Sequence, residues 1–229
     1  WSASYYANKL ISYLAETNPE IAYRFNADTL GVRSSRALRQ LKELQDEEGA
    51  WSWYKGMKGS RYMTTQVMEL LARLQMLTGK PLEEAEAKKL YTNGMAYLAK
   101  EAKKEYDILK KLDKEGKKPL IPSEQVLHYL YICALNGTGK GDEAKVNRYF
   151  IDRLVKLENA GALTIYGKAC SAVILQLAGE ENKAKEVLQS LMEYSVYTDE
   201  MGRYFDTPRA EYSWKSYRIP TQVAAIEAI

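Results

Sequence analysis

Hydrophobic residues recur along most of the chain with the period of an α-helix. This pattern predicts helices over residues 4–16, 31–45, 61–78, 82–113, 123–136, 142–158, 163–178 and 182–194. Gly79 followed by Pro81 is typical of a helix end, and Ser123 after Pro122 is typical of a helix start. The sequence therefore predicts an all-α protein.

The predicted helices are of two kinds. Those containing Val126–Leu135 and Ala169–Leu175 are apolar on nearly every side, so they must be buried. Others carry an apolar stripe opposite many charged residues, namely the helices at 31–45, 82–113, 142–158 and 182–194. An inner set of apolar helices and an outer set of amphipathic ones is typical of an α/α toroid, a two-layer ring of helical hairpins, which is complete or partial here.

A solenoid of helical pairs predicts a similar alternation, and the segment from Tyr166 to Leu188 weakly resembles a tetratricopeptide unit. The apolar helices begin near residues 61, 123 and 163. These offsets are too unequal for an array with a repeat of fixed length. We therefore favour the ring over the solenoid.

Two further elements are expected close to the C-terminus. Val196–Thr198 and Arg203–Phe205 flank a turn that ends in Gly202, which predicts a small β-hairpin. An apolar helix is expected from Thr221 to Ile229, after Pro220. The hairpin is expected to be a small addition to an otherwise helical domain.

Composition narrows the possible partners. The chain has 229 residues and a formal net charge of +3, and a cluster of lysines between residues 103 and 118 is interspersed with acidic residues. Such a mixed stretch is typical of a solvated helix, so we expect no nucleic-acid binding. No run approaches the roughly 18 apolar residues that span a bilayer, so direct membrane insertion is not expected. We predict a single domain over residues 1–229.

The two ends of the sequence suggest a fragment. Trp1 opens the chain without a methionine or a signal peptide, and the apolar helix after Pro220 stops without a capping glycine or a polar tail. We therefore expect the chain to be part of a larger multidomain protein.

Residues capable of catalysis or metal binding are few. His128 is the one histidine of the sequence, so a multi-histidine metal site is impossible and a histidine-based catalytic site would have to use it. It falls in an apolar helix, where a buried core histidine is expected, and it stays a weak candidate. Cys133 and Cys170 lie in apolar helical runs and are expected to be small buried hydrophobes. No catalytic, cofactor-binding or metal-binding residues are predicted.

The segment from residue 45 to residue 66 is the most informative part of the sequence. Gln45, Gly49 and Trp51 form a Q-x-x-x-G-x-W pattern, in which a Trp lies beneath a helix end and the Gln side chain bonds free backbone groups there. The pattern continues through Trp53, Gly56, Gly59, Ser60 and Thr64.

These ordered residues resemble the terpenoid-cyclase-like toroidal thioester-type domain of bacterial alpha-2-macroglobulins. Ser4–Asn8 is similar to the helix that follows the thioester motif in Bacteroides-type relatives. Near the C-terminus, Gly202–Phe205 resembles the hairpin of that domain. The following run resembles its W-x-x-Y-x-I-P-T-Q segment through Trp214, Tyr217 and Pro220.

The resemblance implies a non-enzymatic domain of a protease-trapping inhibitor at the periplasmic face of the cell envelope. Its partners would be proteases and the other domains of the parent protein. The thioester of the family joins the Cys and Gln of a C-x-E-Q motif, and neither Cys133 nor Cys170 has those neighbours. In the relatives the motif lies just before the helix that begins here near Ser4.

Two alternatives belong to other functional classes. One is a glycosidase or a polysaccharide lyase built on the same ring. An inverting glycosidase needs two carboxylates, and the acidic residues close to aromatic loops are Asp46, Asp206 and Glu211. The D-x-D-D motif of class II terpene cyclases and the zinc ligands of prenyltransferases are absent from the sequence. The other alternative is a helical protein-interaction scaffold.

Overall fold

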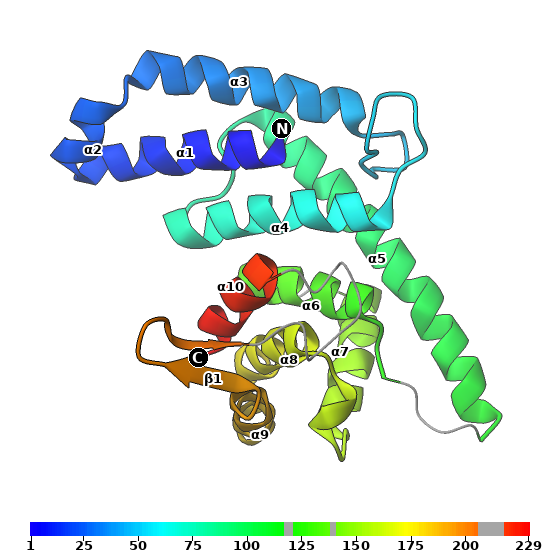
Figure 1. Ribbon diagram of the computed structural model, residues 1–229. Helices are drawn as coiled ribbons and strands as arrows, with labels where there is room; N and C mark the ends of the chain where they lie inside the picture. Colours follow the sequence, from blue (N-terminus) through cyan, green and yellow to red (C-terminus); the bar gives the residue numbers. More distant parts are fainter. Residues whose placement is uncertain (117–120, 138–140, 206–217) are drawn as a thin grey trace. The chain divides into compact units, whose positions relative to one another are not determined.

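The protein is mostly helical, with one two-stranded antiparallel hairpin near the C-terminus (Figure 1). The computed structural model describes residues 1–116, 121–137, 141–205 and 218–229. Its helices are α1 (Ser2–Thr17), α2 (Pro19–Arg24), α3 (Ala27–Leu44), α4 (Arg61–Thr78), α5 (Ala85–Lys114), α6 (Glu124–Asn136), α7 (Asp142–Val155), α8 (Ile165–Leu177), α9 (Glu181–Met192) and α10 (Arg218–Ala228). A 3-10 turn, η1, covers Ala160–Ala162, and the strands are β1 (Ser195–Thr198) and β2 (Gly202–Phe205). The predicted helical class and the predicted hairpin are confirmed.

Capping residues explain where the helices differ from the prediction. The helix expected from residue 31 begins at Ala27, because the Asn26 side chain accepts a hydrogen bond from the backbone N–H of Thr29 at 2.9 Å. The short helix α2 was not expected, although Asn18 caps it and Pro19 stands at its first position. Two Asn caps close together therefore turn an expected loop into helix.

The last helix also begins earlier than expected. α10 starts at Arg218 instead of Thr221, so Pro220 lies inside its first turn. A proline is tolerated there because the first N–H groups of a helix have no partner within the helix.

The chain divides into two compact units, Trp1–Lys104 and Glu105–Ile229, and the boundary falls within α5. In the first unit α1 packs against α2, α3 and α4, and it lies between α3 and α4 (Figure 1). Serine and glycine delimit α4: the Ser60 hydroxyl caps its start, and Gly79 ends it with φ of 63°. The predicted stop at Gly79 is confirmed.

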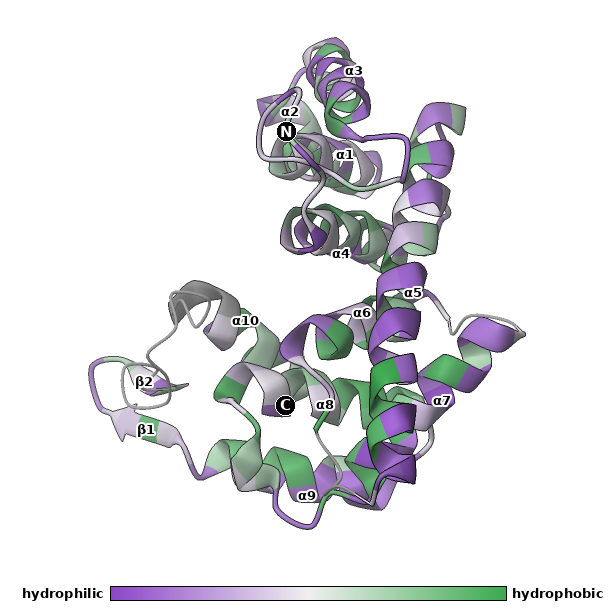
Figure 2. Ribbon diagram, turned by 90° about the vertical axis from the view of Figure 1, so that its right-hand side faces the viewer, coloured by the Kyte–Doolittle hydropathy of each residue, from purple (hydrophilic) through white to green (hydrophobic). Residues whose placement is uncertain are grey.

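The second unit is organised around α8, which packs against α6, α7, α9 and α10. Every residue of α6 from Val126 to Cys133 is buried, as its apolar sequence predicts. The helices α7 and α9 each bury one face, and Figure 2 shows both hydrophobic and hydrophilic residues along the helices of this unit. The two predicted kinds of helix are therefore both present.

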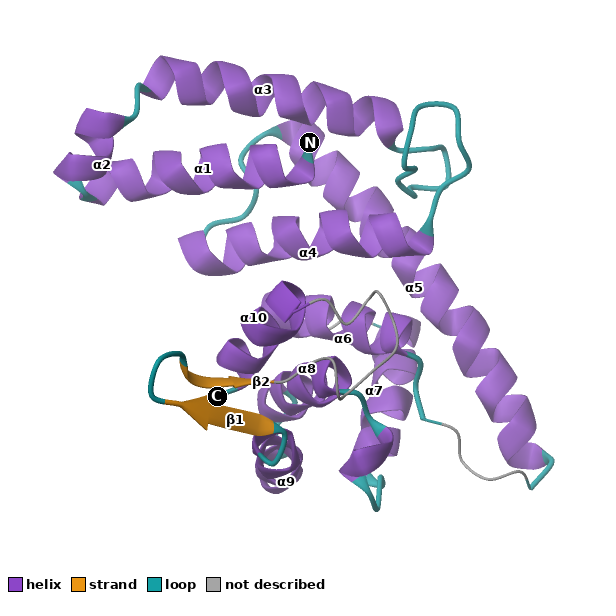
Figure 3. Cartoon of the chain, viewed as in Figure 1, coloured by secondary structure: helices purple, strands orange, loops and turns teal. Residues whose placement is uncertain are grey.

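Gln222 of α10 and Phe205 of β2 hold the hairpin against α10. β1 and β2 pair with Ser195 opposite Phe205 and Thr198 opposite Gly202, which has a φ of 68° (Figure 3). The Gln222 side chain donates to the carbonyl oxygen of Phe205 at 2.6 Å and accepts from its N–H at 3.1 Å. Phe205 then packs into a core cluster with Ile165, Ala169, Leu191, Ala224 and Ala225. A short hairpin that would be marginal by itself is stabilised in this way.

Candidate functional site

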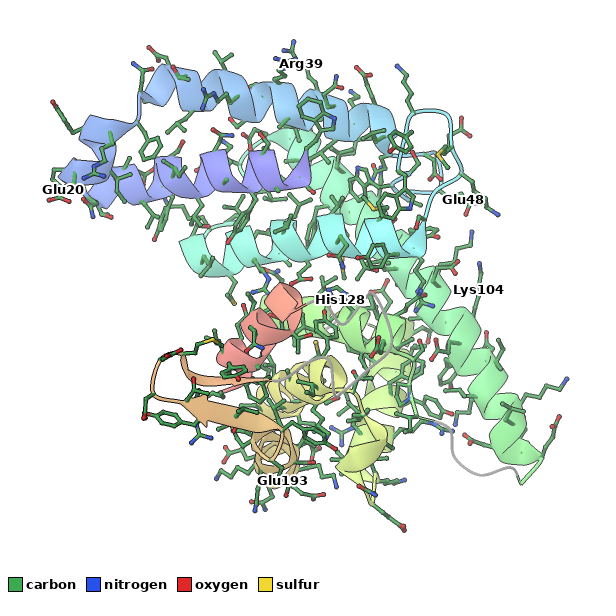
Figure 4. The ribbon with its side chains drawn as sticks, in the orientation of Figure 1. Glu20, Arg39, Glu48, Lys104, His128 and Glu193 are labelled. Carbon is green, nitrogen blue, oxygen red and sulfur yellow. The ribbon has the colours of Figure 1, made fainter. Side chains whose placement is uncertain are left out.

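The loop between α3 and α4 folds into a closed turn. Gln45 and Trp51 pair as an isolated antiparallel bridge, so the chain reverses within residues 45–51. Inside the turn the N–H of Asp46 donates to the carbonyl of Ala50 at 2.8 Å, and the N–H of Gly49 donates to that of Asp46 at 3.0 Å. Figure 4 shows the dense side chains around this loop, where Glu48 is labelled. The segment that carries the strongest sequence pattern is thus an ordered structure.

Trp51 is the centre of this structure. Its side chain is 1% exposed, and its indole Nε1 donates to the carbonyl oxygen of Leu41 in the last turn of α3 at 2.9 Å. The same carbonyl also accepts from the backbone N–H of Gln45 at 3.2 Å. A buried indole N–H needs an acceptor, and a carbonyl oxygen can accept two hydrogen bonds. The contact therefore pairs the indole and places Trp51 beneath the end of α3.

Gln45 joins the turn to α5. Its Nε2 donates to the carbonyl oxygens of Gly49 at 3.1 Å and of Leu90 at 2.9 Å. Its Oε1 accepts from the side-chain amide of Asn93 at 3.3 Å. The sequence predicted that Gln45 bonds backbone groups at the helix end, and the structure shows that it also reaches α5, which begins forty residues later in the chain.

The glycines of the pattern have distinct steric reasons. A Cβ on Gly49 would lie 2.3 Å from the carbonyl oxygen of Asn93, and its φ is +89°. A Cβ on Gly59 would lie 2.4 Å from both the Cβ of Ala50 and the Oδ2 of Asp46. Neither position has room for a side chain, which explains why the loop needs glycine at both.

Thr64 attaches the turn to the start of α4. Its hydroxyl accepts from the backbone N–H of Trp51 at 2.8 Å and donates to the carbonyl of Ser60 at 2.8 Å. The N–H of Ser60 donates in turn to the carbonyl of Trp51 at 2.8 Å. The backbone of Trp51 is thus fully paired although it is buried.

Trp53 differs from Trp51. It is 49% exposed and stacks on Tyr62, with ring centroids 6.0 Å apart and an interplanar angle of 15°. Tyr54 and Met57 nearby in sequence are also exposed. The two tryptophans of one pattern therefore have different environments, one in the core and one on the surface.

Sequence reasoning missed the part of α5 that receives Trp51. A Cβ on Gly94 would lie 2.8 Å from Cζ3 of Trp51 and 2.4 Å from the sulfur of Met68. Glycine inside a helix costs about 1 kcal/mol relative to alanine, so its presence there points to a close contact. Gly94 in the middle of a long amphipathic segment was the available signal.

The other two segments of the resemblance are partly described. In α1, Tyr5 is 1% exposed and its hydroxyl donates to Glu84 at 2.8 Å; burial and that carboxylate raise the pKa of Tyr5. Trp214 and Tyr217 lie outside the described residues, and of Pro220 only the backbone within α10 is described. The residues that the structure brings together are therefore those of the first pattern.

His128 lies in the second unit, away from that pattern in the sequence. Its side chain is labelled in Figure 4. It is 7% exposed and meets the ring of Tyr166 edge to face, with centroids 5.7 Å apart. Glu124, one turn earlier, accepts a hydrogen bond from the Thr164 hydroxyl at 2.7 Å. The surroundings of His128 are those of a packed core residue.

The structure also shows the environment of the two cysteines and of one candidate carboxylate, Asp46. Cys133 and Cys170 are both buried, and burial raises the pKa of the Cys133 thiol to about 11. The Oδ1 of Asp46 accepts a hydrogen bond from the N–H of Ala50 at 2.9 Å, so this carboxylate stabilises the turn. Asp206 and Glu211 lie outside the described residues.

Within the described parts of the chain, no group of three or more His, Cys, Asp or Glu side chains is arranged to hold a metal ion. No helix there is both long enough and apolar enough to cross a membrane. A scan against protein-family models and a search of the curated proteins each give no match for this sequence. The family resemblance rests on residues of this chain alone.

Removing the indole tests its importance for stability. Trp51→Ala is expected to lower the free energy of unfolding by roughly 3 to 5 kcal/mol, because it empties a fully buried site and removes the hydrogen bond from the indole to the Leu41 carbonyl. Trp53→Ala is the control, with an expected loss of about 1 kcal/mol or less. Chemical denaturation measures both, and a loss below about 0.5 kcal/mol for Trp51→Ala would show that the indole has no structural role.

Adjacent threonines offer a matched test of the turn. Thr64→Val should lower the free energy of unfolding by about 1 to 3 kcal/mol, because it leaves the buried N–H of Trp51 without an acceptor. The equally buried Thr65 bonds only the carbonyl of Arg61 within its own helix, so Thr65→Val should cost less. Equal losses in urea titrations would contradict the role assigned to Thr64.

Proposed function

We propose that this chain is a non-enzymatic domain of a bacterial alpha-2-macroglobulin-like protease inhibitor. The observation that carries the proposal is the hydrogen-bonded unit of Gln45, Trp51 and Thr64. These residues are shared with the family pattern, and each has a partner that its residue type requires. These hydrogen bonds give a physical reason for the same residue types to occur at the same spacing in proteins that form this turn.

The proposal includes the ring architecture. The buried helices α6 and α8 have the character of an inner layer, and the amphipathic helices α7 and α9 have that of an outer layer. The packing of the consecutive helices α8 and α9 against each other suits the helical hairpins of an α/α toroid.

The role of such a domain is mechanical. In the family, cleavage of a bait region by a protease moves the toroidal domain relative to its neighbours. We propose that this chain takes part in that movement at the cell envelope, with the other domains of its parent protein and the trapped protease as partners. Under this proposal the domain has to stay folded while it moves, and the buried turn around Trp51 contributes to that stability.

Under this proposal the two cysteines of the chain do not form a thioester. A reactive thioester needs a Cys and a Gln in a C-x-E-Q sequence, which neither Cys133 nor Cys170 has. Both side chains are also buried, 3% and 1% exposed. Covalent capture would have to come from residues outside this sequence.

Methylamine separates these cases. The 229-residue chain treated with methylamine should gain no mass and release no thiol. The same chain extended by the sequence encoded before Trp1 should gain the mass of one methylamine if that sequence supplies C-x-E-Q. Intact mass spectrometry with a thiol assay measures both products.

Two results would count against the proposal. Uptake of methylamine by the chain itself would overturn the assignment of its cysteines. An encoded sequence before Trp1 that holds neither a C-x-E-Q motif nor sandwich domains would remove the basis for the inhibitor.

The exposed aromatic pair favours a second candidate function, carbohydrate binding or cleavage on the same type of ring. Trp53 is half exposed and stacked with Tyr62, which offers a flat apolar surface to a sugar ring. Aromatic faces of this kind are a usual component of concave binding sites. A carbohydrate-active enzyme would in addition need two acidic residues at the site.

A screen with oligosaccharides tests this candidate. If it holds, some oligosaccharide should bind or be cleaved, and Trp53→Ala should weaken binding by about tenfold or more while leaving the folded state intact. Met57→Ala, a change of another exposed residue in the same loop, is the control. Turnover that is lost on replacing one acidic residue would replace the inhibitor proposal with an enzyme, whereas no binding would remove this candidate.

A further inference from the structure

The sequence contains two Asn-Gly pairs, Asn93 with Gly94 and Asn136 with Gly137. In such a pair the asparagine side chain can react with the backbone nitrogen of the glycine, because glycine has no Cβ to obstruct the approach. The reaction requires that this nitrogen is not held in a hydrogen bond and that the backbone around it can move. The two pairs of this protein differ in both respects.

Asn136 and Gly137 lie where α6 ends. Asn136 is the last residue of the helix, and Gly137 leaves it with φ of 90° and ψ of 152°. The N–H of Gly137 makes no hydrogen bond with any described residue, whereas the N–H of Gly79, which also follows a helix, donates to the carbonyl of Met76 at 3.3 Å. Asn136 and Gly137 are both exposed, and a Cβ on Gly137 would meet no described atom within 4 Å beyond its chain neighbours. The nitrogen of Gly137 is therefore unhindered on the side of the Asn136 side chain.

Asn93 and Gly94 lie inside α5 and are held there. The helix directs the N–H of Gly94 to the carbonyl four residues earlier. The side-chain amide of Asn93 donates to Oε1 of Gln45 at 3.3 Å. Gly94 is buried, and a Cβ there would lie 2.4 Å from the sulfur of Met68. A reaction at this pair therefore requires α5 to open locally first.

We propose that Asn136 is a site of spontaneous deamidation in the folded protein. The nitrogen of Gly137 attacks the side-chain Cγ of Asn136, and the new C–N bond closes a five-membered imide. The amide nitrogen of Asn136 leaves as ammonia and takes up the proton of the Gly137 N–H. Water then opens the imide at either carbonyl, which gives aspartate or isoaspartate and needs no further reactant.

The modification changes the end of α6. Both products carry a negative charge that asparagine lacks. The last carbonyl groups of a helix already carry partial negative charge, so the new carboxylate is repelled there. The inference is independent of the inhibitor proposal, because it depends only on the local geometry of Asn136 and Gly137.

Ageing of the full chain in warm, mildly alkaline buffer made with heavy-oxygen water tests the site. Peptide mapping by mass spectrometry should show Asn136 converted at least about tenfold faster than Asn93, since a local opening that costs about 1.4 kcal/mol already slows a reaction tenfold. The product should be a mixture of aspartate and isoaspartate. It should carry heavy oxygen, which marks the opening of the imide during the incubation.

The unfolded chain and a variant are the controls. In concentrated urea both pairs lose their surroundings, so their rates should agree within about threefold, with residual structure as the remaining difference. Asn136→Gln would need a six-membered ring, so it should show no conversion at residue 136 while Asn93 reacts as before. Asn136→Asp has the charge of the product and should lower the Tm by roughly 1 to 4 °C.

The proposal is overturned if Asn136 stays intact in the folded chain, or if Asn93 reacts there as fast as Asn136. Aspartate without isoaspartate at residue 136 would also overturn it, because direct hydrolysis passes through no imide. An unchanged Tm for Asn136→Asp would contradict the effect assigned to the new charge.

Discussion

The burial of the Trp51 indole is the contact on which the first unit depends. The ring lies between the end of α3 and the segment of α5 around Gly94, and its N–H pairs with the Leu41 carbonyl. A Trp buries 150 to 250 Å² and contributes a large apolar surface at one point. Because this surface is shared by elements far apart in sequence, the loop that carries it has to be fixed as well.

That requirement accounts for the polar residues of the loop. A buried backbone must have its hydrogen bonds satisfied, and the main-chain groups around Trp51 lie too deep for water to do so. Thr64 of α4 and Gln45 of the turn supply the missing donors and acceptors. Gly49 and Gly59 then let the chain pass where a side chain would collide. An exact residue pattern is thus the consequence of one buried ring.

The second unit follows a different scheme. α8 is packed on several sides and buries even Lys168, whose Nζ lies 3.9 Å from the ring centroid of Tyr194 and 3.5 Å from the carbonyl of Ser190. Cation–π contact and a carbonyl replace part of the hydration that the ammonium loses.

The sequence by itself determined the helical class, most of the helix positions, the hairpin and the existence of a special turn at residues 45–51. It could do so because periodicity, capping residues and glycine act over a few neighbouring residues. It did not predict α2, whose six residues are too few to show a helical period, or the start of α10 at Arg218, before Pro220.

Only the tertiary structure decided which residues meet. Nothing local in the sequence says that Gln45 reaches Leu90, that Gly94 makes room for Trp51, or that Trp51 is buried while Trp53 is exposed. These outcomes depend on how α5 packs against α3 and α4, a contact between segments separated by tens of residues. Side-chain periodicity reports which face of a helix is buried, but it carries no information about what covers that face.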